Sequence, residues 1–354
     1  MDKILSFFLT TVIFITLFPF SGQAAPKCLI FVHGHRTDQE TVKNYHAVES
    51  YWIGKETNKL GMESGPVRDG VAAATRNGYH HAFLVGYDAT DSYFNGAVEV
   101  SKQIERAMQG LPDLGGTRSC PVETEGAPTQ YIVVAHSMGG VVMDYILGNA
   151  VPSSPYYNYK GAPFDKVTSK ISYVMTVGTP HIGTAVADLI MQGSHNMLLN
   201  VLTWAFSHPD HGTEWLQTLP NYQVSHYMSA PLREVRLYTG WNSMGSSLLL
   251  RGNDDGVSSV ATAFACNGDP NANRRIKVRT QRFPFYDLPL CENSPMGHMG
   301  GFRNYSNMNW SEENHADQRR DIYHGKRHTQ GVPGGSSCLE NGSFLEEVAC
   351  NAGQ

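Results

Sequence analysis

The sequence predicts an α/β fold with a doubly wound, mostly parallel sheet, and three observations support this prediction. Short apolar runs of strand length recur along the chain. These runs alternate with stretches of helical spacing, the pattern of strand–helix–strand units. Segments that contain candidate catalytic residues directly follow several of the runs. They lie at the carboxyl ends of the predicted strands, where open parallel sheets place their active sites.

Six apolar segments are typical of buried strands. They cover residues 27–32, 82–87, 131–134, 171–177, 233–238 and 276–283. The spacing of apolar residues predicts helices over 98–108 and 141–147, and weaker helical patterns cover 46–58 and 65–75. We expect residues 276–283 to be the sixth strand of the same sheet.

Residues 1–25 have the pattern of a secretory signal peptide. A short charged start precedes an apolar run over 4–20, and small residues follow up to Ala25. The alternative is an uncleaved membrane anchor. That run is shorter than the roughly 20 residues that span a bilayer, and Pro19 interrupts it. We therefore expect an exported protein, secreted or periplasmic, with one main domain over 26–354.

The net charge bears on the partners of the chain, and the cysteines bear on its disulfides and on a zinc site. The net charge of the 354-residue chain is −5 and no basic run occurs, so a nucleic-acid partner is not expected. Six cysteines in an exported chain predict up to three disulfides. None of them has the C-x-x-C spacing of a structural zinc site.

Residues 184–230 interrupt the alternation of strands and helices. Two apolar helical runs, over 186–191 and 197–206, lie within them. One interpretation is ordinary core helix. The other is a lid-like insertion over a site for apolar substrates, which would also contact a lipid interface. The tail over 316–354 is polar and glycine-rich and is expected to be a C-terminal extension.

Three histidines and an aspartate lie in the same interruption. They are His195, His208, His211 and Asp210. Their irregular spacing favours solvated loop histidines, and a metal site is the alternative.

The segment Ala135-His136-Ser137-Met138-Gly139-Gly140 carries the strongest functional signal. It joins a predicted strand to a predicted helix and surrounds Ser137 with small residues. A serine in this context is typical of a nucleophile elbow. The alternative is a serine that caps the helix. A serine nucleophile needs a base, a carboxylate that orients the base, and two donors for the oxyanion.

The oxyanion donors are expected from two backbone amides. One is the N–H of Met138, which follows the nucleophile. The other is the N–H of His35, in the loop His33-Gly34-His35 after the first strand. In the alternative interpretation, His33 and His35 are metal ligands or plain loop residues.

The acid is expected in a loop after the fifth strand, because this fold orders its triad as serine, acid, histidine. Residues 252–259 form such a loop, and Asp255, beside Gly256, is the candidate. Asp254 is the alternate. An Asx turn explains the same Asn-Asp-Asp-Gly cluster without catalysis.

The base is expected on a later loop. His298 lies among glycines in residues 294–301, where an imidazole has room to approach the serine. His315 is the alternate, and its sequence context also suits an exposed helix start. His324 and His328 lie in a basic, surface-like run.

At these motifs the chain resembles the α/β-hydrolase superfamily and, within it, secreted bacterial lipases and esterases. The resemblance covers Cys28 to Gly301, and its four motifs are Phe31-Val32-His33-Gly34, Ala135 to Gly140, Gly178 to Thr184 and Asn253 to Ser259. In such lipases the segment at 178–184 enters the lid region. Two adjacent aspartates in the acid loop, and a histidine motif at 314–317 besides His298, depart from the simplest family pattern.

The resemblance implies a serine carboxylic ester hydrolase with a Ser-His-Asp triad, an acyl-enzyme intermediate and no cofactor. It also suggests disulfides between Cys266 and Cys291 and, less strongly, between Cys28 and Cys120. Analogy with the family would also allow a calcium site near Asp254, for which the sequence itself gives no pattern. The alternatives are an acyltransferase or amidase with the same triad, and a non-catalytic binding protein on this scaffold. The expected substrate is a small-molecule or lipid ester.

Overall fold

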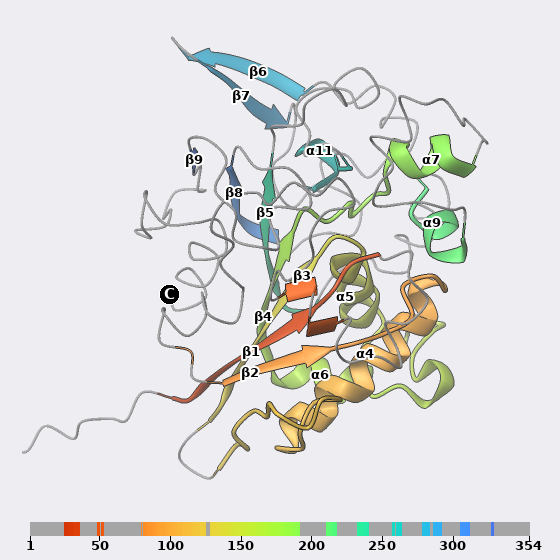
Figure 1. Cartoon of the computed structure of the whole chain (residues 1–354), viewed down its shortest axis with the longest axis vertical. Coiled ribbons are helices and arrows are strands. Elements are labelled where there is room, and N and C mark those ends of the chain that lie inside the picture. The colour runs from red at the N-terminus through yellow and green to blue at the C-terminus, as the bar shows by residue number, and fades with distance from the viewer. Residues whose placement is uncertain are drawn as a thin grey trace, which may run out of the picture.

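A mostly parallel sheet forms the centre of the molecule in a computed structural model of the chain (Figure 1). The described residues are 25–35, 48–49, 51–52, 79, 81–124, 128–191, 210–217, 232–240, 257–258, 260–263, 278–283, 286–291, 305–311 and 327–328. Of the predicted signal peptide over 1–25, only Ala25 lies within the described residues.

The seven strands of this sheet follow the order β2-β1-β3-β4-β5-β8-β9. Their bounds are β1 Lys27–Val32, β2 His81–Val85, β3 Gln130–His136, β4 Ile171–Val177, β5 Glu234–Gly240, β8 Tyr305–Ser311 and β9 Arg327–His328. All pairings are parallel except that of β8 with the two-residue β9. The prediction of a mostly parallel sheet is confirmed.

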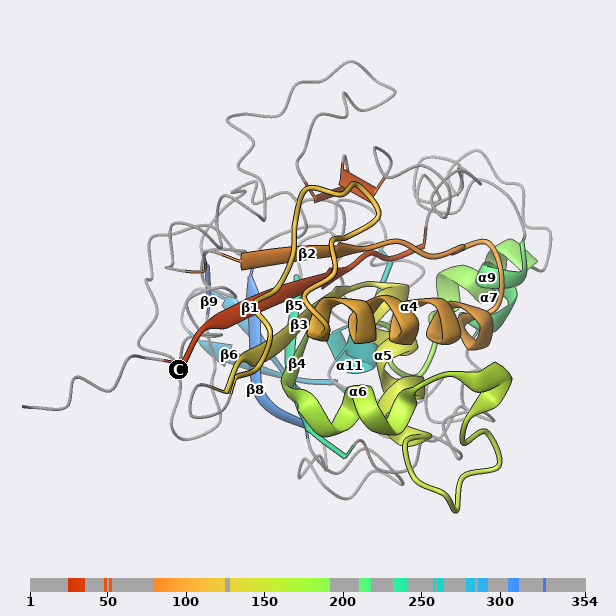
Figure 2. The same cartoon turned by 90° about the horizontal axis from the view of Figure 1, so that it is seen from below.

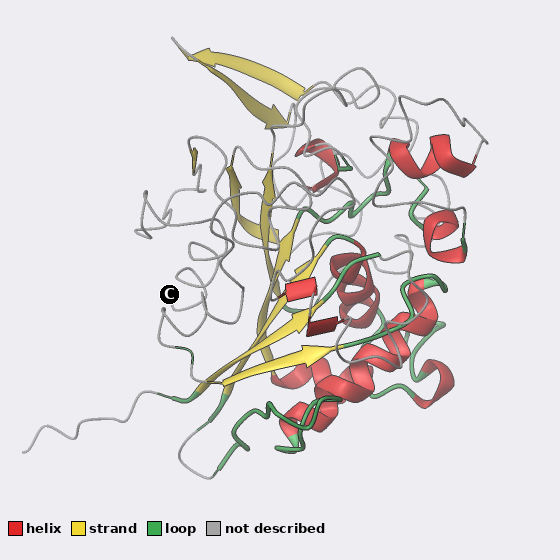
Figure 3. Cartoon of the chain, in the orientation of Figure 1, coloured by secondary structure: helices red, strands yellow, loops and turns green. Residues whose placement is uncertain are grey.

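Helices alternate with these strands along the chain (Figure 3). Their bounds are α4 Tyr93–Met108, α5 Met138–Gly148, η1 Tyr159–Gly161, α6 Phe164–Lys170, α7 Ala185–Met191, α9 His211–Trp215 and α11 Val260–Ala263. Helix α4 begins five residues before the predicted 98–108, because Ser92 caps it by accepting a hydrogen bond from the Asn95 N–H.

The central strands are buried on both faces. In β3, Tyr131, Val133 and Ala135 belong to one core cluster, which also contains residues of α4, α5 and α6. These three helices lie together on one side of the sheet (Figure 2). Ile132 and Val134 point to the opposite face, whose cluster contains Val48, Tyr51 and Trp52. Burial on both faces explains why these strands read as continuous apolar runs.

The prediction for the sixth strand was wrong. Residues 278–283 form β6, which pairs antiparallel with β7 (Tyr286–Cys291) in a separate two-stranded sheet. The strand beside β5 is β8, which the sequence analysis missed. Four polar residues separate Val278 from Phe283 in β6, and β8 has no continuous apolar run, so composition did not show which of the two joins the main sheet.

Helix α7 opens the interrupted region 184–230. Its residues Val186 and Ala187 are buried in the main core cluster, as the core-helix interpretation expects. The run 197–206 lies outside the described residues, as does the predicted helix over 65–75. Within the described part of the chain, no helix combines the length and apolarity needed to cross a membrane.

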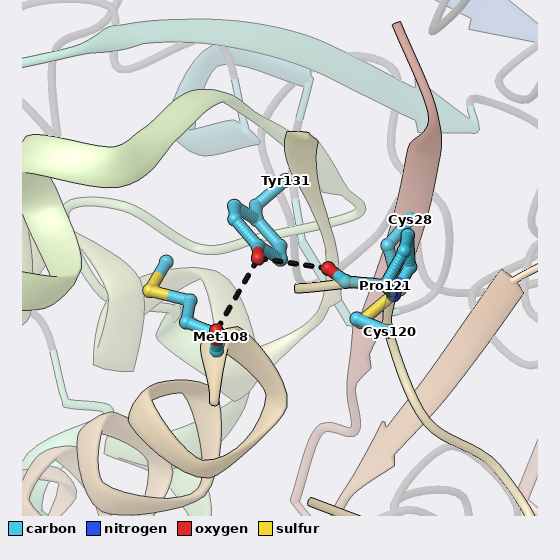
Figure 4. The surroundings of a disulfide bond; sticks show 5 residues. All are labelled: Cys28, Met108, Cys120, Pro121 and Tyr131. Carbon is cyan, nitrogen blue, oxygen red and sulfur yellow. Dashed lines mark hydrogen bonds between the residues drawn. A yellow bond between two sulfur atoms is a disulfide. The ribbon is translucent and has the colours of Figure 1, made fainter. Parts of the chain in front are cut away.

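A disulfide joins Cys28 to Cys120, as the sequence analysis suggested (Figure 4). It fastens the loop ahead of β3 to β1. Tyr131, the register partner of Cys28, places its hydroxyl 3.0 Å from the Pro121 carbonyl oxygen. Because 92 residues separate the cysteines, chain entropy alone gives the bond a stabilisation of about 4–5 kcal/mol. The other suggested pair includes Cys266, which is outside the described residues.

Candidate active site

Ser137 stands in a strained turn between β3 and α5. Its φ and ψ are 54° and −129°, a conformation that non-glycine residues rarely adopt and that costs about 1–3 kcal/mol. The Ser137 N–H donates to the Val177 carbonyl oxygen at 2.9 Å, which ties the turn to the end of β4. The Ser137 side chain makes no capping hydrogen bond to α5, so the helix-cap alternative does not describe it.

Close packing explains the glycines of the elbow. A Cβ atom on Gly139 would lie 2.5 Å from the His33 carbonyl oxygen, and one on Gly140 would clash with Thr179. The first turn of α5 therefore packs directly against the end of β1 and the segment after β4. Larger side chains at these two positions would push the elbow away from both.

The loop after β1 lies against Ser137. A Cβ atom on Gly34 would be 2.5 Å from the Ser137 Cβ and 2.9 Å from the His136 carbonyl oxygen. The Gly34 N–H donates to the Tyr51 hydroxyl at 3.0 Å, and the next amide along the chain is that of His35. On the other side of Ser137, Met138 begins α5, and first-turn amides have no acceptor within their own helix.

The His33 side chain is engaged by its own neighbours. Its Nδ1 lies 2.8 Å from the Gly34 carbonyl oxygen, and its Nε2 accepts from the Tyr87 N–H at 3.2 Å. The Tyr87 ring stacks on the imidazole at 4.4 Å. Burial raises the pKa of Tyr87 well above its usual value, so its neutral hydroxyl donates to the His33 carbonyl oxygen. These contacts make His33 a structural residue of the loop rather than a metal ligand.

The His35 side chain reaches into the interrupted region. Its Nε2 lies 3.0 and 3.1 Å from the two carboxylate oxygens of Asp210. Asp210 also caps α9, because it accepts from the Thr213 N–H at 2.6 Å. Burial alone would raise the pKa of Asp210, but the bond and charge of His35 and the Thr213 donors bring the pKa below its usual value.

Asp210 therefore joins the loop after β1 to α9. His211 is exposed and pairs with Glu214 on its own helix at 3.0 Å. His195 and His208 are outside the described residues, within which no cluster of three or more metal-ligating side chains occurs.

The segment Gly178 to Thr184 connects the elbow to the proposed acid loop. The Ser258 hydroxyl donates to the Gly178 carbonyl oxygen at 3.1 Å, and the Thr184 hydroxyl donates to the Val257 carbonyl oxygen. Asp254 and Asp255 lie outside the described residues, just before this anchored pair.

A second histidine–aspartate pair fastens the same segment, and the sequence analysis missed it. His181 Nδ1 lies 2.5 Å from the Asp144 carboxylate, and its Nε2 lies 3.0 Å from the Thr176 hydroxyl. Both side chains are buried. The sequence offers one sign of this pair, because Asp144 is the single acidic residue in the apolar run of α5 and a buried carboxylate requires a partner.

The candidate bases differ in their position relative to β8. His298 precedes β8 and His315 follows it, and both lie outside the described residues, as does His324. His328 lies in β9, where it is the register partner of Trp310.

Comparisons with known proteins found no matching family model and no matching curated protein. Among solved structures, the chain is similar to lipase 1 from Pelosinus fermentans, with 15% identity, coverage of 93% of this chain and 99% of that chain, and a TM-score of 0.47. The mature lipase BlEst2 from Bacillus licheniformis shows 16% identity, coverage of 68% and 80%, and a TM-score of 0.43. The metagenomic carboxyl esterase MGS0156 shows 13% identity, coverage of 93% and 75%, and a TM-score of 0.44. The structural resemblance to bacterial lipases and esterases is thus present at low identity.

Proposed function

We propose that this chain is an exported serine carboxylic ester hydrolase of the lipase or esterase type. The observation that carries the proposal is the environment of Ser137. Its backbone is strained, its side chain does not cap α5, and the backbone of the loop after β1 lies against it. A serine held in this way at the carboxyl edge of a parallel sheet suits nucleophilic attack on a carbonyl carbon.

The reaction follows from this arrangement. The Ser137 Oγ attacks the ester carbonyl and its proton passes to a histidine. The N–H groups of Met138 and His35 stabilise the oxyanion of the tetrahedral intermediate. Its collapse expels the alcohol, which takes the proton, and leaves an acyl-enzyme. Water, deprotonated by the same histidine, then releases the acid and restores Ser137. No cofactor or metal enters these steps.

Asp255 is the proposed acid, with Asp254 as the alternate. Val257 and Ser258 are hydrogen-bonded to the segment that follows β4, and β4 is the neighbour of β3, the strand directly before Ser137. Asp255 comes two residues before Val257, and two residues of chain span at most about 7 Å. This reach supports an acid near the carboxyl edge of the sheet.

His298 is the proposed base and His315 the alternate, and the strand order allows the reach of the chain to be compared for the two. His315 lies four residues after Ser311, the carboxyl end of β8. Four residues reach about 14 Å, roughly the width of the three strand spacings between β8 and β3. His298 precedes β8 by seven residues, which reach about 25 Å, and a path from the amino end of β8 to Ser137 needs nearly all of that length. Each histidine would use nearly all of its reach, so the comparison favours neither and mutation has to decide.

The proposed substrates are esters with apolar acyl groups. The interrupted region 184–230 is rich in apolar residues. Its described helix α7 belongs to the core, so a lid-like role and contact with a lipid interface are proposed for the remainder of that region.

The deciding experiment compares Ser137→Ala with Ser101→Ala on p-nitrophenyl esters of increasing acyl length. Ser101 is a matched control, because it is buried in α4 and its hydroxyl donates within that helix. We expect Ser137→Ala to lose turnover and labelling by a serine-directed phosphonate, and Ser101→Ala to keep both. Wild-type turnover that persists in Ser137→Ala would refute the proposal.

The same assay separates the alternatives. An added alcohol or amine acceptor diverts product from acid to ester or amide if the chain is an acyltransferase, and amide substrates are cleaved if it is an amidase. A binding protein shows neither turnover nor phosphonate labelling. The variants His298→Ala and His315→Ala identify the base, since only the true base should lower kcat by several orders of magnitude.

A further inference from the structure

The Tyr51 hydroxyl joins the two backbone segments that would form the oxyanion hole. The Gly34 N–H donates to the Tyr51 hydroxyl oxygen at 3.0 Å. The same oxygen lies 2.5 Å from Nδ1 of His136, the residue directly before the nucleophile. Since the oxygen accepts from Gly34, its own proton is available to donate to His136. One hydroxyl thus links the loop after β1 to the last residue of β3.

This hydroxyl also lies beside the nucleophile. A Cβ atom on Gly34 would be 2.7 Å from the Tyr51 hydroxyl oxygen and 2.5 Å from the Ser137 Cβ. Gly34 in the loop after β1, Ser137 directly after β3 and the Tyr51 hydroxyl are therefore immediate neighbours. Any displacement of the hydroxyl changes the distance between the loop amides and Ser137.

The surroundings of Tyr51 keep its ring in place. The ring is buried between the imidazoles of His33 and His136, with centroid separations of 5.6 and 5.7 Å. The next residue, Trp52, is also buried, and its ring centroid lies 5.0 Å from that of Phe31 in β1. Two residues before Tyr51, Glu49 pairs with Arg118 at 3.1 Å. Tyr51 is thus fastened to the sheet face beneath the loop.

We propose that Tyr51 is a positioning residue for the oxyanion hole, an inference that rests on the proposed ester hydrolysis. Its hydroxyl holds the Gly34 amide away from the oxyanion and fixes the His33–Gly34 peptide plane. The contact of His33 Nδ1 with the Gly34 carbonyl oxygen then holds the next peptide plane, which carries the His35 N–H. Tyr51 does not touch the substrate. It acts on the tetrahedral intermediate through the backbone of the loop.

The proposal predicts a specific kinetic result for Tyr51→Phe, which removes one oxygen atom and keeps the ring. We expect kcat to fall by about ten- to a hundredfold, less than for loss of an oxyanion donor itself, with KM within about twofold. Tyr93→Phe is the matched control, because Tyr93 is buried and its hydroxyl makes no hydrogen bond within the described residues. We expect this control to retain kcat.

The other partner of the hydroxyl provides a second test if Tyr51→Phe folds poorly. His136→Leu removes the acceptor, whereas the amide oxygen of His136→Asn approximates Nδ1. We expect kcat to fall in His136→Leu and to recover in part in His136→Asn. A structural role alone predicts no such recovery once both variants are folded.

Hydrogen–deuterium exchange of the peptide containing residues 33–35 tests the tether without any activity. Exchange should accelerate in Tyr51→Phe and stay at the wild-type rate in Tyr93→Phe. Unchanged exchange or unchanged kcat in Tyr51→Phe would overturn the inference. Equal turnover by wild type and Ser137→Ala would instead reject ester hydrolysis at Ser137, and the exchange result would still decide whether Tyr51 holds the loop.

Discussion

Two histidine–aspartate pairs occupy different environments in this molecule. In His181–Asp144 both side chains are at most 1% exposed, and the pair joins α5 to the segment after β4. In His35–Asp210 the carboxylate is 19% exposed, and the pair joins the loop after β1 to α9. The first pair is enclosed by the core, and the second lies at the boundary between the core and the interrupted region.

Because the two pairs differ in burial, we expect them to contribute differently to folding stability and to turnover. Removing one partner of an enclosed pair leaves an uncompensated polar group without water, which is strongly destabilising. At a boundary, water solvates the remaining partner and the cost is smaller. The boundary pair, however, includes a residue of the loop that lies against Ser137. We therefore expect the enclosed pair to govern folding and the boundary pair to govern turnover.

The largest expected effect is on stability, in Asp144→Ala. The change leaves the buried imidazole of His181 without its carboxylate, and we expect a loss of about 3–5 kcal/mol in the free energy of unfolding. Urea denaturation measures it. Asp165→Ala, at a partly buried position of α6, should cost no more than about 1 kcal/mol. A similar small cost for Asp144→Ala would contradict the proposed contrast.

Asp210→Ala should act mainly on catalysis. It releases His35 and removes the cap of α9, so we expect about a tenfold fall in kcat and a stability loss of about 1–2 kcal/mol. Asp210→Asn separates the two effects, because asparagine caps helices as well as aspartate does. It should keep most of the stability and still lower kcat. Wild-type kcat in both variants would show that the pair does not support the loop.

The boundary pair should also produce an acid-dependent stability difference. The pKa of Asp210 is lower in the folded protein than its usual value of about 3.9, so its ionised form stabilises the fold. This contribution is complete above the unfolded pKa and disappears as the pH falls through the folded pKa. We expect the stability gap between wild type and Asp210→Asn to be fully developed near pH 5 and to narrow in more acidic buffer. A gap that widens with acid would reverse the sign of the argument.

The smallest effect is expected for a third pair, at the surface. His211 and Glu214 face solvent, with side chains 75% and 47% exposed. His211→Ala should change the free energy of unfolding by less than about 0.5 kcal/mol and leave turnover unaltered. Thermal or urea unfolding of the variants of all three pairs measures the stability lost in each, and we expect this loss to increase with the burial of the pair. A large loss here would mean that burial does not set the ranking.

The sequence predicted the part of the fold that is buried on both sides. Strands β1, β3 and β4 appear as continuous apolar runs because helices or aromatic side chains cover both of their faces. The same criterion failed for β8, whose polar composition resembles a loop, and it misassigned β6, which pairs only with β7. A strand-like segment in the sequence does not say which sheet the strand joins.

The sequence by itself also predicted the turn at Ser137, which joins β3 to α5, and the Cys28–Cys120 pair, because each depends on local spacing or on the order of neighbouring strands. Only the tertiary structure decided the partners of the polar side chains around them. Tyr51 meets His136 across 85 residues, Asp144 meets His181 across 37, and His35 meets Asp210 across 175. No periodicity encodes such pairs, since each arises when separate elements bury polar groups that must then bond to one another.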